Sequence, residues 1–228
     1  MKTTLKSIIS PIALGFGLLL QPTYAATIAG WSFESLTLGS ANTNTPPDGW
    51  LNNIAPETGS GTASGFHATT NAAYSTATGN NSSKSISANR WSVGDYYQFA
   101  ISTIGFKDIT LSYDQIGTST GPVSFRLDYS TNGTDFATFG SAYTVSSNSW
   151  TSVASDLSPF TGLNNQPSVV FRIVDVSAIA INGGSVGWSG ADRVDNFIVA
   201  ATLVPEPSIG TLGVVGGLAC LIAGRRKH

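Results

Sequence analysis

The sequence predicts an all-β fold, a sandwich of two sheets, on the basis of three observations. Apolar and polar side chains alternate over residues 95–101, 107–116 and 122–130, as they do in strands with one buried face. Asn132-Gly133 follows the third of these segments and favours a turn between strands. No amphipathic helical pattern of about ten residues or more is found between the two ends of the chain. We therefore expect a β-sandwich flanked by an N-terminal signal helix and a C-terminal transmembrane helix.

The first 25 residues have the organisation of a secretory signal peptide. Two lysines precede an apolar stretch at residues 8–20, and the segment finishes with small residues at Ala25. This order predicts cleavage after Ala25. An uncleaved anchor helix is the alternative, although Pro11 interrupts the stretch and Pro22 ends it.

The segment between residues 36 and 83 is rich in Ser, Thr, Asn, Gly and Ala, and Pro46-Pro-Asp-Gly-Trp50 is its strongest turn signal. We expect long loops there and no helix. Beyond the Asn-Gly turn, short runs separated by turn residues predict further strands at residues 141–146, 150–155, 168–176, 184–189 and 192–201. Many short strands of this kind pack as two facing sheets.

The last 25 residues form a tail with three parts. Val204-Pro-Glu-Pro207 is followed by an uncharged apolar run at residues 209–223 and then by Arg225-Arg226-Lys227. At about 1.5 Å per residue the run extends for roughly 22 Å, which predicts a transmembrane helix over residues 208–224. The cationic end favours a cytoplasmic C-terminus, so the body is expected on the other side of the inner membrane.

This tail resembles the PEP-CTERM sorting signal of Gram-negative bacteria, through Val204, Pro205, Glu206 and Pro207, the apolar span, and Arg225 with Arg226. The resemblance covers about the last 25 residues. It implies recognition by an exosortase, a membrane transpeptidase-like enzyme, and removal of the helix by cleavage near the motif. It also implies a protein of the cell surface or extracellular matrix, associated with exopolysaccharide and biofilm. A permanent single-span anchor is the alternative.

The expected organisation is therefore a signal peptide at 1–25, a sandwich at 26–203 and a sorting signal at 204–228. The whole chain has 11 basic and 13 acidic residues, of which the two ends hold five basic residues and Glu206. Six basic and 12 acidic residues remain, a formal charge of −6 on the body, which disfavours nucleic acid as a partner. The only cysteine, Cys220, lies in the tail, so the body has no disulfide or thiolate chemistry.

Four segments of the body together are similar to the MAM-like and carbohydrate-binding jelly rolls. They are Trp31-Ser-Phe-Glu34, residues 46–50, Tyr129-Ser-Thr-Asn-Gly133 and Val194-Asp-Asn-Phe-Ile-Val199. The resemblance implies a jelly-roll sandwich whose first and last strands are neighbours. It also implies a structural calcium ion, which many such domains bind.

Glu34, Asp192, Asp195 and Asn196 supply the hard oxygen donors that calcium prefers, and we expect a structural calcium site where the chain ends meet. The alternative is that Asp195 and Asn196 bind a nearby loop while Glu34 caps exposed backbone. No ordered spacing of oxygen ligands like that of the EF-hand is present.

Five tryptophans could include a platform on which a sugar ring stacks, and Trp50 and Trp91 are the expected candidates because turn residues flank them. The alternative is that each tryptophan fills the core. Arg126 and Arg172 lie in strand patterns, and Arg193 lies between Asp192 and Asp195. These arginines are expected to pair with acids such as Asp128 and Asp175 rather than grip an anionic ligand.

Catalytic residues are not expected. His67 is the single histidine of the body, and no nucleophile motif accompanies it. Glu34 and Glu57 could act as acid and base only at a separation that the sequence does not define.

The sequence thus favours an exported, non-enzymatic surface or matrix protein that is sorted by an exosortase. Its expected partners are the exosortase, exopolysaccharide and, through the tail, the inner membrane. A carbohydrate-binding module with a discrete sugar site is the alternative, and a secreted hydrolase is a further one.

Overall fold

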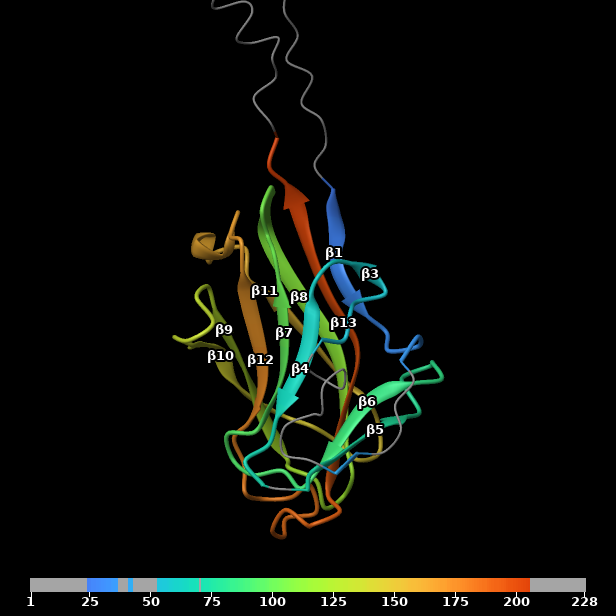
Figure 1. Ribbon diagram of the computed structural model, residues 1–228. Helices are drawn as coiled ribbons and strands as arrows, with labels where there is room; N and C mark the ends of the chain where they lie inside the picture. The colour runs from blue at the N-terminus through green and yellow to red at the C-terminus, as the bar shows by residue number, and fades with distance from the viewer. Residues whose placement is uncertain (1–23, 37–40, 43–52, 70, 206–228) are drawn as a thin grey trace, which may run out of the picture.

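The protein is described by a computed structural model at residues 24–36, 41–42, 53–69 and 71–205. The predicted transmembrane helix, nearly all of the predicted signal peptide, and Trp50, Glu206, Pro207, Arg225 and Arg226 lie outside these ranges. Within them, no helix is long and apolar enough to cross a membrane. The described part is a sandwich of two antiparallel sheets, shown in Figure 1.

The larger sheet has eight strands in the order β11-β8-β13-β6-β5-β2, with β1 paired to β13 and β3 paired to β1. Its strands are β1 (Ala25–Trp31), β2 (Ala41–Asn42), β3 (Thr58–Gly59), β5 (Ala73–Ala77), β6 (Ser85–Asn89), β8 (Phe106–Gly117), β11 (Thr151–Asp156) and β13 (Ala191–Leu203). The first and last long strands are neighbours, with Ala25 opposite Thr202. This confirms the adjacency that the jelly-roll resemblance implied.

The smaller sheet has five strands in the order β10-β9-β12-β7-β4. They are β4 (Thr62–Phe66), β7 (Tyr96–Ile101), β9 (Ser124–Ser130), β10 (Ala137–Thr144) and β12 (Val169–Asp175). A single 3-10 turn, η1 (Thr161–Leu163), is the one helical element within the described ranges.

The core fills the space between the facing sides of the sheets with aromatic side chains. Phe99 of β7 stacks on Phe197 of β13 with ring centroids 3.5 Å apart. Trp31 packs edge-on against both rings and donates its indole N–H to the Ile54 carbonyl at 2.9 Å. These rings join strands from both sheets, so their burial stabilises the sandwich as one unit.

Most of the predicted strands are confirmed, and two predictions about residue segments are wrong. Residues 184–189 form loop rather than strand, with isolated bridges such as Ile179 to Ser185 and a positive φ at Gly183. Conversely, β3, β4 and β5 lie in the region where long loops were expected. Their small side chains give no alternating pattern, yet the backbone pairs with β1, β7 and β6.

Candidate functional site

Each of the four residues predicted to bind calcium has hydrogen-bond partners within the protein. Asp192 is buried and accepts a hydrogen bond from Gln115 Nε2 at 2.9 Å. Asp195, three residues along β13, accepts from Asn80 N and Ser82 Oγ of the β5–β6 loop, at 2.7 and 2.8 Å. The strand pairs with β8 in unbroken register from Asp192 to Asp195, so these two residues, three apart, lie on opposite faces of β13.

Glu34 and Asn196 also bind protein groups. Glu34 Oε1 accepts from Lys84 N at 2.7 Å, and Asn196 Nδ2 donates to Asp114 Oδ2 at 3.0 Å. Nowhere in the described ranges do three or more His, Cys, Asp or Glu residues gather so as to hold a metal ion. The four side chains bind protein groups: Asp195 and Glu34 hold the β5–β6 loop, and Asp192 and Asn196 bind side chains of β8. Calcium binding stays a prediction.

The structure places the described tryptophans differently from the prediction. Trp91 is a core residue, 5% exposed, whose indole N–H donates to the Ala88 carbonyl at 2.9 Å. Rings of His67, Tyr97 and Phe125 pack against it, so the expectation that Trp91 offers a face to a sugar is corrected. Trp188 is the exposed one, at 66%, with the Arg90 guanidinium 4.0 Å from its ring centroid.

The groups considered for acid–base chemistry hold structural positions. His67 is buried, and desolvation lowers its pKa to about 3, so it is neutral at physiological pH. Its Nδ1 lies 2.6 Å from Tyr74 Oη. Glu57 accepts from the backbone N–H groups of Ser32 and Ser35. These bonds give the glutamate a capping role.

The expected pairing of arginines with acids holds for one of the two strand arginines. Arg126 Nε donates to both oxygens of Asp128, at 2.9 and 3.1 Å. Arg172 lies opposite Asp128 in the sheet register, yet its Nε donates to Gln98 Oε1 at 2.8 Å, and it forms no ion pair with a described acid. For Arg172 the pairing prediction is wrong.

The outer face of the five-stranded sheet carries a feature that the sequence did not predict. Alternation along β7 turns Tyr96 and Gln98 away from the core, and the register sets Phe66 of β4 opposite Tyr96. Arg172 of β12 lies opposite Gln98. With Phe136, which follows the Asn-Gly turn, these side chains form a row across the sheet.

We call Phe66, Tyr96, Arg172 and Phe136 the aromatic row. Phe66 and Tyr96 stack at 5.6 Å with an interplanar angle of 27°. The Arg172 guanidinium carbon lies 4.0 Å from the centroid of Tyr96 and 3.6 Å from that of Phe136. The row therefore stacks planar groups against one another and includes two cation–π contacts.

Polar groups run beside the aromatic row. Gln98 Nε2 donates to Ser64 Oγ at 3.3 Å while its Oε1 accepts from Arg172, so an amide links β4 to β12 across β7. Phe66 stands on the edge strand and is 37% exposed. This face thus combines an accessible ring with hydrogen-bonding groups whose positions are fixed by their neighbours.

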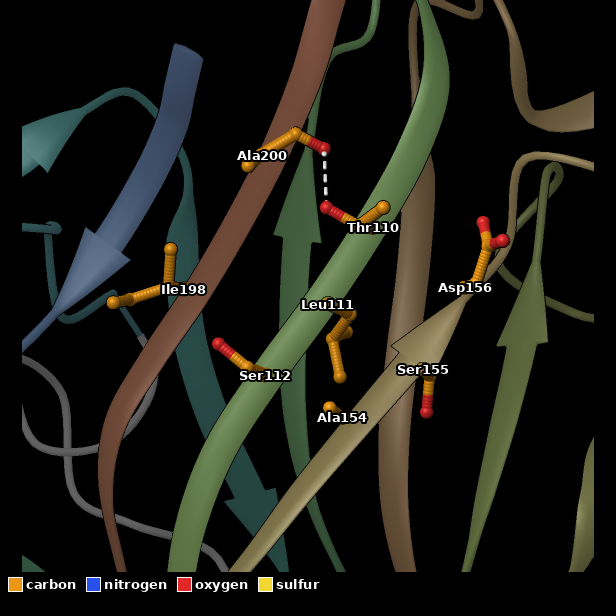
Figure 2. Close-up of a pocket in the computed structure, with 8 residues that line it drawn as sticks. All are labelled: Thr110, Leu111, Ser112, Ala154, Ser155, Asp156, Ile198 and Ala200. Atoms are coloured by element: carbon orange, nitrogen blue, oxygen red, sulfur yellow. Dashed lines mark hydrogen bonds between the residues drawn. The ribbon is translucent and has the colours of Figure 1, made fainter. Parts of the chain in front are cut away.

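Two hollows lie elsewhere on the described surface. The first, of about 370 Å³, is on the outer face of the larger sheet over β11, β8 and β13. Figure 2 shows its floor of small side chains, among them Ser112 and Ala154, with Thr110 Oγ1 donating to the Ala200 carbonyl. The second, of about 340 Å³, lies between the edge strands β10 and β11. The first hollow has no aromatic ring in its lining.

Comparison with known proteins finds no matching family model and no matching curated protein. Among solved structures, the chain is similar to the CBM22-1 xylan-binding domain from Paenibacillus barcinonensis Xyn10C, with 11% identity and a TM-score of 0.42 over 81% of this chain and 100% of that one. It is similar to TmCBM61 in complex with beta-1,4-galactotriose, with 9% identity and a TM-score of 0.36 over 61% and 86%. The K3 cleaved adhesin domain of Lys-gingipain from Porphyromonas gingivalis shows 15% identity and a TM-score of 0.39 over 76% and 98%. At such TM-scores the likenesses carry no argument about function.

Proposed function

We propose that this chain is a non-enzymatic polysaccharide-binding protein whose jelly-roll domain holds its ligand on the outer face of the five-stranded sheet. The aromatic row is the observation that carries the proposal. Aromatic faces pack well against the apolar C–H faces of pyranose rings, and hydrogen-bonding side chains beside them orient the hydroxyl groups. The exposed ring of Phe66 beside Gln98 and Ser64 offers both.

The shape of this face suits an extended chain rather than a small buried ligand. Phe66, Tyr96 and Phe136 belong to a row that crosses β4, β7 and β12 on the surface of the sheet. A ligand lying along the row contacts several groups in succession, so each additional sugar unit adds buried area.

The proposal extends to where the protein works. The two terminal signals support export, recognition of the tail by an exosortase and delivery to the cell surface or extracellular matrix, as expected from the sequence. A polysaccharide-binding domain has its ligand in that location, because exopolysaccharide is the material of the matrix. The membrane-anchored form is then the precursor of the mature protein.

Binding to polysaccharide tests the site directly. Tyr96→Ala is expected to weaken retention on insoluble or gel-embedded polysaccharides by about tenfold, the equivalent of roughly 1.4 kcal/mol, because it removes a ring from the middle of the row. The measurement is affinity electrophoresis of the full-length chain over a panel of neutral and acidic polysaccharides.

Trp188→Ala is the matched control, because Trp188 is an exposed aromatic residue that lies outside the row and also stacks on an arginine. Retention of that variant should equal that of the unchanged protein. If Trp188→Ala lost binding while Tyr96→Ala kept it, the site would be at Trp188 and the aromatic row would be excluded. Absence of binding to every polysaccharide in the panel would refute the function itself.

A further inference from the structure

Arg172 has hydrogen-bond donors that no described residue uses. Its Nε donates to Gln98 Oε1, and this is the one hydrogen bond that its guanidinium makes within the described ranges. The two terminal nitrogens therefore keep their N–H donors for solvent or for a ligand. Arg172 is half-buried and lies on the outer face of the sheet.

The guanidinium is also held in one orientation. The rings of Tyr96 and Phe136 contact it at 4.0 and 3.6 Å, and Gln98 fixes the Nε. A planar fork that is already positioned loses little conformational freedom when it binds, which raises the affinity obtained from each hydrogen bond.

The acid nearest to Arg172 in the register, Asp128, forms its ion pair with Arg126 and none with Arg172. The strands turn Arg126, Asp128 and Arg172 onto this part of the face, and Asp135 lies in the turn just before Phe136. Partial burial lowers the pKa of Arg172, although the charge of Asp128 acts to raise it, and an arginine remains protonated in proteins.

We propose that the polysaccharide bound on this face carries carboxylate groups, as a uronate-containing chain does, and that Arg172 binds them through its terminal N–H groups. This inference rests on the proposed function and names its ligand class. A carboxylate presents two oxygens in a plane, which matches the arginine fork, and a charge-assisted pair of this kind is about twice as strong as a neutral hydrogen bond.

The acidic character of the body does not prevent a carboxylate from binding at Arg172. Its formal charge of −6 is spread over the whole domain, and interactions between exposed charges are largely screened beyond about 8 Å at physiological salt. The contact with Arg172 is a short-range one, so the guanidinium that Gln98 and the two rings hold in place decides whether a carboxylate binds.

The test compares oligogalacturonate with its methyl ester, which keeps the sugar rings and removes the charge. Isothermal titration of the full-length chain is expected to give about tenfold tighter binding for the acid, a difference of roughly 1.4 kcal/mol. The advantage of the acid should shrink as salt is added, while binding of the ester stays constant.

Variants identify the residue responsible. Arg172→Gln should bind the acid and the ester equally, and Arg172→Lys should keep part of the preference because a point charge remains without the fork. Lys107→Gln, which removes an exposed cation from the other sheet, should leave the preference unchanged. Circular dichroism of each variant checks that it folds. If Arg172→Gln does not fold, a reduced preference for the acid in Arg172→Lys identifies Arg172 as the residue responsible.

Equal binding of acid and ester by the unchanged protein would overturn the uronate inference and leave the proposed function standing, provided that Tyr96→Ala still weakened both. A preference for the acid that survives in Arg172→Gln and Arg172→Lys would also overturn it. The expected loss of preference in Arg172→Gln alone supports it. Failure of every polysaccharide to bind would overturn the proposed function as well.

Discussion

Asp175 and Asp192 are acidic residues in the interior, and each has one carboxylate oxygen without a hydrogen-bond partner among the described residues. Burial raises the pKa of Asp175 to about 7, and the nearby charge of Asp95 adds to the effect. Burial likewise raises the pKa of Asp192 well above its usual value. Both groups bind protons more tightly in the folded state than in the unfolded one.

The direction of the pH dependence follows from these shifts. A carboxyl with a raised pKa contributes stability that is fully present below its unfolded pKa of 3.8 and is lost as pH rises through about 7 for Asp175. His67 has the opposite sign, because its pKa is lowered to about 3, so it favours the folded state above its unfolded value of 6.5. The two effects oppose each other at acidic pH, and above pH 6.5 the carboxyl groups dominate the slope.

Asp175→Asn isolates the carboxyl contribution. The variant should melt at nearly the same temperature as the unchanged protein at about pH 3.5, below the unfolded pKa of the carboxyl, and at a clearly higher temperature at pH 8, because it no longer has to bury a charge. A gain of at least roughly 3 °C at pH 8 is expected, the shift that about 1 kcal/mol produces in a domain of this size. A difference in melting temperature that stayed constant from about pH 3.5 to pH 8 would contradict the raised pKa of Asp175.

At the scale of elements, the β5–β6 loop is held by acidic side chains of β13 and of the segment after β1. Asp195 and Glu34 accept backbone N–H groups of Asn80 and Lys84. Gly79 belongs to this loop, and an added Cβ there would collide with Ser82 Oγ, the Lys84 carbonyl and Asp195 Oδ2. The loop can therefore close over β13 only if residue 79 has no side chain.

Gly79→Ala is expected to lower the free energy of unfolding by about 1–3 kcal/mol, because the loop must move away from its acceptors. Gly162→Ala is the matched control, since an added Cβ there meets no atom within 4 Å. Urea unfolding of both variants measures the difference. Equal stability of the two variants would show that the loop accommodates the methyl group. The hydrogen bonds of the loop to Asp195 and Glu34 would then contribute little to the stability of the fold.

The strands were predictable to the degree that their side chains alternate. In β7, β8 and β9 one face is apolar and the other polar, so local sequence alone indicates them. In β4 and β5 small residues occupy both faces, and these strands form because partners already in the sheets supply their hydrogen bonds. Pairing of that kind depends on the whole sheet and not on the segment itself.

The candidate site shows the same limit. Alternation in β7 could place Tyr96 and Gln98 on an outer face, but nothing local sets Phe66 beside Tyr96, because β4 has no recognisable pattern. The acids of β13 were recognised as oxygen donors. Their partners, such as Asn80 and Ser82, are more than a hundred residues away in the sequence. The sequence could therefore not show whether these acids bind a loop of the protein or a metal ion.

For the whole molecule, the two ends of the domain leave from one place. Ala25 begins β1 and lies opposite Thr202 near the end of β13, and Figure 1 shows both strand ends at the same end of the sandwich. Beyond β13, Val204 N still donates to the Gly105 carbonyl at 2.8 Å. Cleavage after Ala25 and after residue 205 would therefore remove little of the described hydrogen bonding.

Mass spectrometry of the mature protein from its native cell surface tests this view of the ends. The expected N-terminus is Ala26, and the expected C-terminus lies near the Val204 to Pro207 motif. The melting temperature of the processed form should equal that of the full-length chain, because both retain β1 and β13. A mature C-terminus at Lys227 or His228 would contradict sorting by cleavage.

The position of β13 also bears on how the domain carries load. This strand is bonded to β8 along most of its length and to β1 and β6 on its other side. If the C-terminal end is the attachment point and the ligand lies on the opposite sheet, a pull from the matrix runs along β13. Its hydrogen bonds to three strands then resist in shear together, instead of opening one after another, so the fold is suited to act as a mechanical link.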